Sequence, residues 1–284
     1  MRTIDKPDLN KIDIYNTCCS SIRSSKEQED LKNYLYIYLL NGASYDYESC
    51  HGDLYKLQSI IKPVVNHKNF IEYEDIKDNL KKLYSQQMLP KEKTARKYYD
   101  KLKSLALLER CPFCGIGIVT TLDHYLPKTE FPIFSVLPYN LVACCKDCNT
   151  DKSTSYATTQ NTQTLHPYYD NFTTEQWLFA RVLQPLKIEF YVQPPVSWNQ
   201  IDKNRVKKHF YNYKLEKRFS VEASNVLATL SHKFTQYFTS ATDIKNELER
   251  EYKIHKDLHL NSWETAMYQA LSQSDWYSNE GHGN

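Results

Sequence analysis

The sequence has 284 residues, of which 41% are hydrophobic and 25% charged, and its net charge at pH 7 is +2. These values are ordinary for a globular protein, and the length suits one large domain or two to three small ones. No apolar run is long enough to span a membrane, and the N-terminus lacks the apolar segment of a signal peptide. We therefore expect a cytoplasmic protein with no membrane partner.

The first part of the chain, residues 1–110, is predicted to be helical. Residues 24–42 begin with the spacing of a capping box and carry apolar residues at helical intervals. Further amphipathic helices are predicted over 53–63, 72–89 and 92–108. Their wide apolar faces indicate that this region also docks a partner.

Residues 111–165 differ in character, because five of the eight cysteines lie there. Two Cys-x2-Cys pairs, Cys111/Cys114 and Cys145/Cys148, have the spacing that lets thiolates converge on Zn²⁺. Cys144 is not expected to bind the zinc, and Cys18, Cys19 and Cys50 are expected to be free thiols. The two pairs are further apart than in a simple zinc ribbon, so the zinc is predicted to clamp a hairpin that carries other residues.

The insert between the cysteine pairs is predicted to be two strands followed by a helix. Residues 117–127 form a strand that stops at Pro127, residues 138–145 return, and a helix begins near 146. Adjacent strand residues point to opposite faces, so Asp123 and His124 need not serve the same ligand. The zinc clamp would bring Asp123 close to Asn149.

After the cysteine module, residues 153–164 are polar and are predicted to be a linker. The C-terminal region, 166–284, is expected to be mostly helical and basic, with one short strand at 186–192. Residues 181–218 hold nine Lys or Arg against three Asp or Glu. Such a cluster fits contact with phosphates and fits a solvated helix face equally well.

The residues of the central module resemble the HNH, or ββα-metal, nuclease family. "LDHYLP" matches the Asp-His element, "NLV" the central Asn, and "CKDCNTDKS" the last element with Asn in place of the third His. The resemblance implies that His124 is the general base and that Asp123 and Asn149 hold a catalytic Mg²⁺ or Mn²⁺. It also implies that Asn140 orients the loop and that Lys152 lies near the phosphate.

A longer stretch, residues 122–153 followed by "LHPYYDNF" and Trp177, is similar to the PtuB branch of this family. These are nuclease subunits of Septu-type anti-phage systems, which also occur in retron cassettes. The resemblance implies an ATPase partner of the PtuA type and, in a retron, reverse transcriptase and msDNA. No P-loop motif occurs in this chain, so any ATP dependence would come from that partner.

Together these patterns predict an α-rich α+β protein with a zinc-stapled ββα nuclease module between helical regions. The expected activity is metal-dependent cleavage or nicking of DNA, or cleavage of RNA such as tRNA. The alternative is a non-catalytic zinc adaptor that binds nucleic acid or an ATPase. The candidates for contact with nucleic acid are Lys128, His166, Lys203, Arg205, Lys207 and Lys208.

Overall fold

A computed structural model describes residues 1–32, 34–57 and 71–283 of the chain. The chain divides into two compact units. The N-terminal unit is Arg2–Asp170, and the C-terminal unit is Asn171–Asn284 together with Met1. Met1 belongs to the second unit because its carbonyl oxygen lies 3.2 Å from the Nε2 atom of His259.

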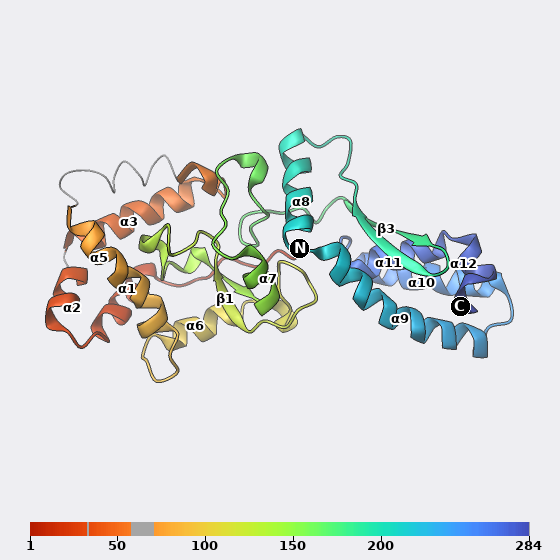
Figure 1. Ribbon diagram of the computed structural model, residues 1–284, viewed down its shortest axis with the longest axis horizontal. Coiled ribbons are helices and arrows are strands. Elements are labelled where there is room, and N and C mark those ends of the chain that lie inside the picture. The colour runs from red at the N-terminus through yellow and green to blue at the C-terminus, as the bar shows by residue number, and fades with distance from the viewer. Residues whose placement is uncertain (33, 58–70, 284) are drawn as a thin grey trace. The chain divides into compact units, whose positions relative to one another are not determined.

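The N-terminal unit combines a small β-hairpin with helices (Figure 1). Its elements are α1 (Lys11–Ser20), α2 (Ser25–Lys32), α3 (Tyr34–Ser49), α5 (Ile71–Lys82), a π-helical segment (Leu83–Met88), α6 (Arg96–Lys103), β1 (Thr121–His124), β2 (Leu141–Cys144) and α7 (Lys146–Lys152). Strands β1 and β2 are antiparallel, with Thr121 opposite Cys144 and His124 opposite Leu141. Helix α6 packs against both strands, and α7 packs against β1.

The β1–β2 hairpin is almost entirely buried, which explains why it needs the helices around it. Every residue of β2 is buried, and Leu122 and Asp123 are buried in the middle of β1. A two-stranded hairpin is marginally stable by itself, so packing on other elements must stabilise it. Helices α6 and α7 supply part of that cover.

The C-terminal unit is a second hairpin packed on long helices. Its elements are β3 (Leu178–Leu183), β4 (Lys187–Val192), α8 (Gln200–Asn212), α9 (Leu215–Tyr237), α10 (Ala241–Leu258), α11 (Trp263–Ser272) and α12 (Asp275–Asn279). Strand β3 packs on α11 and β4 packs on α9. Side-chain caps mark the starts of α8 at Asn199, α10 at Ser240 and α11 at Ser262, where each cap accepts a backbone hydrogen bond.

The coarse prediction of an α-rich α+β protein is confirmed, since the described residues are mostly helical with two small antiparallel sheets, but the observed units differ from the predicted regions. Residues 2–110 and 111–165 fall in one unit, Arg2–Asp170. One contact between them is the hydrogen bond from Arg2 N to Pro112 O, at 2.8 Å. The boundary predicted between 165 and 166 lies close to the observed one, between Asp170 and Asn171.

Several predicted elements also differ in detail. The predicted linker, 153–164, is part of the N-terminal unit, since Gln163 is buried and its amide contacts the Gly52 carbonyl and the Tyr55 amide. The helix predicted over 24–42 is α2 and α3, which runs on to Ser49. Most of the helix predicted over 53–63 lies outside the described residues. Strand β3 was not predicted, and it completes the hairpin with the strand predicted at 186–192.

None of the described helices is both long enough and apolar enough to cross a lipid bilayer.

Candidate active site

The four cysteines of the two Cys-x2-Cys pairs meet in one buried cluster. The Sγ atoms of Cys111, Cys114, Cys145 and Cys148 all lie within 4.8 Å of one another. Tetrahedral zinc with Zn–S bonds of about 2.3 Å places its sulfur atoms about 3.8 Å apart. The Cys114 and Cys145 Sγ atoms are 3.9 Å apart, which matches that separation. The cluster therefore has the ligand type, number and spacing of a structural zinc site.

The backbone around the cluster supports the same assignment. Gly115 has φ +78°, which a side chain would disfavour, and its N–H donates to the Cys111 carbonyl at 2.7 Å. Gly117 N donates to Cys114 Sγ at 3.3 Å, and Cys148 N donates to Cys145 Sγ at 3.5 Å. Donation of N–H groups to sulfur stabilises thiolates, the form in which cysteine binds zinc. The predicted zinc ligands are thus brought together, and Cys144 is outside the set.

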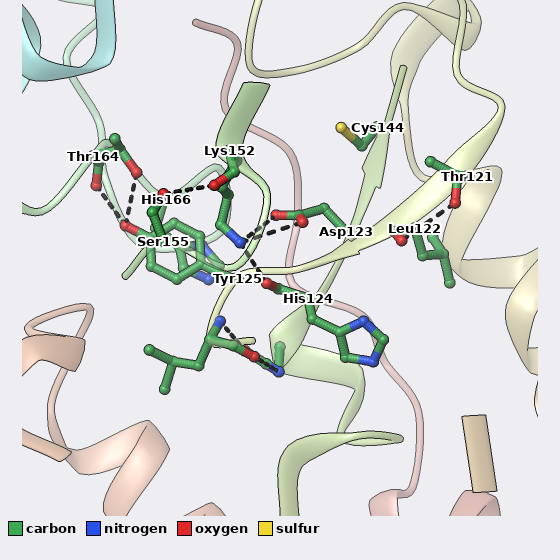
Figure 2. Close-up of polar contacts among 12 residues, drawn as sticks. Thr121, Leu122, Asp123, His124, Tyr125, Cys144, Lys152, Ser155, Thr164 and His166 are labelled. Carbon is green, nitrogen blue, oxygen red and sulfur yellow. Dashed lines mark hydrogen bonds and ion pairs between the residues drawn. The ribbon is translucent and has the colours of Figure 1, made fainter. Parts of the chain in front are cut away.

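Asp123 and His124 point to different sides of β1, as the alternation of a strand requires. Figure 2 shows the Asp123 carboxylate directed at Lys152, while the His124 ring extends away from that pair. Asp123 is 2% exposed, and His124 is only partly buried. The two side chains therefore face different surroundings.

The His124 ring is held in one orientation by the loop between the strands. Its Nε2 lies 2.9 Å from the Ser135 carbonyl, which can only accept, so Nε2 carries the proton. Nδ1 is then the acceptor, and among the described residues none donates to it. Burial lowers the pKa of His124 to about 3, against the opposing effect of the Ser135 hydrogen bond. The imidazole is therefore neutral near pH 7 with a free lone pair, as a proton acceptor requires, although burial also makes it a weaker base than an imidazole whose pKa lies near the working pH.

An aromatic and a basic side chain border this imidazole. The Tyr84 ring meets His124 edge-on, with centroids 4.4 Å apart. Lys128 Nζ lies 4.9 Å from the centre of the same Tyr84 ring. Burial lowers the pKa of Lys128, and the neighbouring charge of Lys81 adds to this effect. The predicted nucleic-acid contact Lys128 is therefore close to the candidate base.

Asp123 forms a buried ion pair with Lys152. Lys152 Nζ is 3.3 Å from Asp123 Oδ1 and 3.2 Å from Oδ2, and it donates to the His124 carbonyl at 2.6 Å. Lys152 is 4% exposed, so it does not face an open phosphate site as predicted. Burial raises the pKa of Asp123, although Lys152 opposes that effect. The pair forms because a buried carboxylate without a counter-charge would be very costly.

Asn149, the second predicted metal ligand, is partly buried on α7. It lies three residues before Lys152 and hence on the same helix face. Because α7 packs against β1, Asn149 and Asp123 lie on neighbouring elements of the module. A carboxylate and an amide oxygen are ligands that Mg²⁺ and Mn²⁺ prefer.

Asn140 holds the loop that contains Ser135, whose carbonyl accepts the hydrogen bond from His124. Its side chain is completely buried and accepts from Leu126 N at 2.8 Å. Its Nδ2 group donates to the carbonyls of Leu126, at 2.9 Å, and Phe134, at 3.3 Å. Phe134 immediately precedes Ser135, so Asn140 positions the carbonyl that orients His124. Asn140 thus links the segment after β1 to the segment before Ser135.

Two of the predicted nucleic-acid contacts are wrong in this structure. His166 is completely buried: its Nδ1 accepts from Tyr168 N, and its Nε2 lies 3.4 Å from the Tyr47 hydroxyl. Arg205 is 5% exposed, on the buried side of α8. Of the other candidates on α8, Lys207 and Lys208 are exposed, and Lys203 donates to the Val196 carbonyl at 2.8 Å.

Three participants in the site were not predicted from the sequence. The Tyr47 hydroxyl donates to Asn140 Oδ1 at 3.2 Å, from 93 positions away. Tyr84 and the Ser135 carbonyl contact His124. Nothing distinguishes Tyr47 or Tyr84 among the 23 tyrosines, and a backbone carbonyl carries no sequence signal.

Comparison with known proteins places the chain in a family. Protein ea31 of Escherichia phage lambda is 38% identical over 217 residues, which cover 70% of this chain and 73% of the relative. The chain belongs to the protein ea31 family. No family model matches the chain, and no solved structure matches it. The name of the ea31 relative states no activity.

Proposed function

We propose that this member of the ea31 family is a metal-dependent HNH endonuclease that hydrolyses phosphodiester bonds of nucleic acid. The observation that carries the proposal is the fixed orientation of His124. Its Nε2 is committed to the Ser135 carbonyl, and its Nδ1 lone pair is left for a water molecule. The order of strand, strand and helix, with four clustered cysteines at their ends, supports the same assignment.

In this mechanism His124 accepts a proton at Nδ1 from the water that attacks phosphorus. Its low pKa keeps the ring neutral, and the Ser135 hydrogen bond stabilises the charge that develops on the imidazolium. Asn140 acts indirectly, because it holds the loop that contains Ser135. Lys128, beside Tyr84, would neutralise a neighbouring phosphate.

The residues that would hold a catalytic cation are Asp123 and Asn149. A bound Mg²⁺ or Mn²⁺ would neutralise charge on the phosphate and on the leaving oxygen. The donor set fits such a hard ion, since it offers carboxylate and amide oxygens rather than sulfur. The cysteine cluster would hold zinc in a purely structural role.

The cellular role that we propose is that of an anti-phage effector of the Septu or retron type. Its support is the resemblance of residues 122–177 to the PtuB branch. The proposed partners are a PtuA-type ATPase and, in a retron, reverse transcriptase and msDNA. The target is DNA, with tRNA or another RNA as the alternative polymer, because a ββα site binds the phosphate and does not select the sugar.

One observation favours a different function, that of a non-catalytic zinc adaptor. The Asp123 carboxylate is buried against Lys152, as a purely structural ion pair would be. In an adaptor, the cysteine cluster and this ion pair would only stabilise a surface for nucleic acid or an ATPase. Activity separates the two functions, since an adaptor cleaves nothing.

The test is a cleavage assay with the zinc-loaded chain on plasmid DNA and on total tRNA. Wild type and His124→Ala are compared with Mg²⁺, with Mn²⁺ and without added metal, and with and without any ATPase that co-purifies. The proposal expects metal-dependent cleavage that His124→Ala lacks, while its zinc content stays unchanged. No cleavage of either polymer by zinc-loaded wild type, with its partner present, would favour the adaptor.

A further inference from the structure

A lysine ammonium group lies among three oxygen atoms at the end of β1. The two carboxylate oxygens of Asp123 are 3.3 and 3.2 Å from Lys152 Nζ, and the His124 carbonyl oxygen is 2.6 Å from it. Figure 2 shows these contacts converging on the lysine nitrogen. Asp123 and Lys152 are 2% and 4% exposed, so the group is closed to solvent.

These oxygens are also what a divalent cation would use. Carboxylate and carbonyl oxygens are the preferred ligands of Mg²⁺ and Mn²⁺. Asp123 Oδ2 is buried 3.2 Å from the Lys152 ammonium, but it accepts no well-aligned hydrogen bond, so the lysine satisfies this oxygen incompletely. An ammonium group and a metal ion cannot share these oxygens, because like charges so close together in a poorly solvated site repel each other strongly.

We infer that the Lys152 ammonium and the divalent metal are alternative occupants of one site, so that Lys152 must leave before the metal binds. The inference deepens the proposed nuclease function and rests on its assignment of Asp123 as a metal ligand. In the conformation described here, Lys152 is the occupant.

The backbone allows Lys152 to leave without loss of the zinc cluster. Lys152 is the last residue of α7, and the helix ends at Ser153, which has a positive φ of +51°. The cysteine ligands of the same helix, Cys145 and Cys148, lie at its other end. Movement of the Lys152 side chain therefore leaves both cysteine ligands in place.

The first test is Mn²⁺ binding to the full zinc-loaded chain, followed by electron paramagnetic resonance. Lys152→Met keeps the length of the side chain and removes the competing charge. Lys146→Met removes the same charge from an exposed position of α7 and is the matched control. If Lys152 fills the site in about nine of ten molecules, Lys152→Met binds Mn²⁺ about tenfold more tightly than wild type. Lys146→Met keeps the wild-type affinity.

An affinity of Lys152→Met equal to or below that of wild type overturns the inference, as does the absence of Mn²⁺ binding to both proteins. Asp123→Asn, added to Lys152→Met, locates the ion. If the double variant loses the tighter Mn²⁺ binding, the shared site is supported. If the double variant still binds Mn²⁺ as tightly as Lys152→Met, the inference is overturned. If Mn²⁺ binds more tightly but no polymer is cleaved, the nuclease proposal fails while the shared site stands.

A second measurement uses the wild-type chain and so does not depend on the folding of a variant. Reductive methylation labels accessible lysines, and mass spectrometry identifies them. Lys152 should be protected without Mn²⁺, because it is buried, and should become labelled as Mn²⁺ displaces it. Lys152 that remains unlabelled when the site is saturated with Mn²⁺ would refute the inference.

Discussion

Replacement of Asn140 by alanine should destabilise the N-terminal unit strongly. The Asn140 side chain makes hydrogen bonds to Leu126 N, Leu126 O, Phe134 O and the Tyr47 hydroxyl, all in buried surroundings. Each buried hydrogen bond contributes about 1 kcal/mol net, so the loss of all four should lower the free energy of unfolding by about 4 kcal/mol. Tyr47→Phe removes one of the four and should cost about 1 kcal/mol.

Zinc release during urea denaturation reports on this unit alone, because the cysteine cluster lies within it. Wild type, Asn140→Ala and Tyr47→Phe are compared, and the midpoint and slope of each curve give the free energy of unfolding. Asn140→Ala within about 1 kcal/mol of wild type would refute the assignment of Asn140 as the residue that fixes the loop. An Asn140→Ala chain that stays folded should also lose cleavage, since the Ser135 carbonyl would no longer be fixed.

Cys145→Ser should lose the zinc and unfold the module, because Cys145 belongs to the four-cysteine cluster. Cys144→Ser should keep the zinc and the folded module, because Cys144 lies outside the cluster. Equal zinc content of the two variants, measured by mass spectrometry, would contradict the ligand set. Burial lowers the pKa of His124 from 6.5 to about 3, so neutral His124 stabilises the fold above pH 6.5, and this stability is lost as the pH falls towards 3. Wild type should therefore lose more stability than His124→Gln between about pH 7 and about pH 5 in urea unfolding, and equal losses would show that the imidazole is not held neutral. Lys128→Ala should weaken nucleic-acid binding and reduce its salt dependence by about one phosphate contact. Lys101→Ala, at an exposed position of α6, is the control and should do neither. Fluorescence anisotropy at several salt concentrations measures both variants, and equal effects would exclude a special role for Lys128.

The cysteine cluster and the strand–strand–helix order could be predicted because their signals are local. Two Cys-x2-Cys pairs specify a tetrahedral cluster through short loops, and Pro127 ends the first strand. The alternation of strand residues also predicted that Asp123 and His124 face different ways. The structure agrees on each of these points.

The contacts that complete the site depend on tertiary packing and carry no local signal. Tyr47 reaches Asn140 from a distant helix, and only the folded hairpin brings Lys152 within reach of Asp123. The ion pair also shows why a prediction from residue type alone placed Lys152 at a phosphate. A lysine on α7 can pair with a phosphate or with a carboxylate, and burial of Asp123 decides between them in this conformation.

The same limit explains the wrong region boundary and the wrong linker. The polar composition of residues 153–164 is that of a linker, yet Gln163 is buried against Gly52 and Tyr55. Composition shows whether a segment can be solvated. It does not show that Gln163 contacts residues more than a hundred positions away in the sequence.

The measurement that tests the nuclease proposal most directly is the cleavage rate of zinc-loaded wild type against His124→Gly at saturating Mn²⁺. We predict a loss of about 10²- to 10⁴-fold, the range typical of a missing general base, and partial recovery when imidazole is added to the buffer. Equal rates for the two proteins, or no cleavage by wild type while zinc and Mn²⁺ are bound, would contradict the assignment of His124 as the catalytic base.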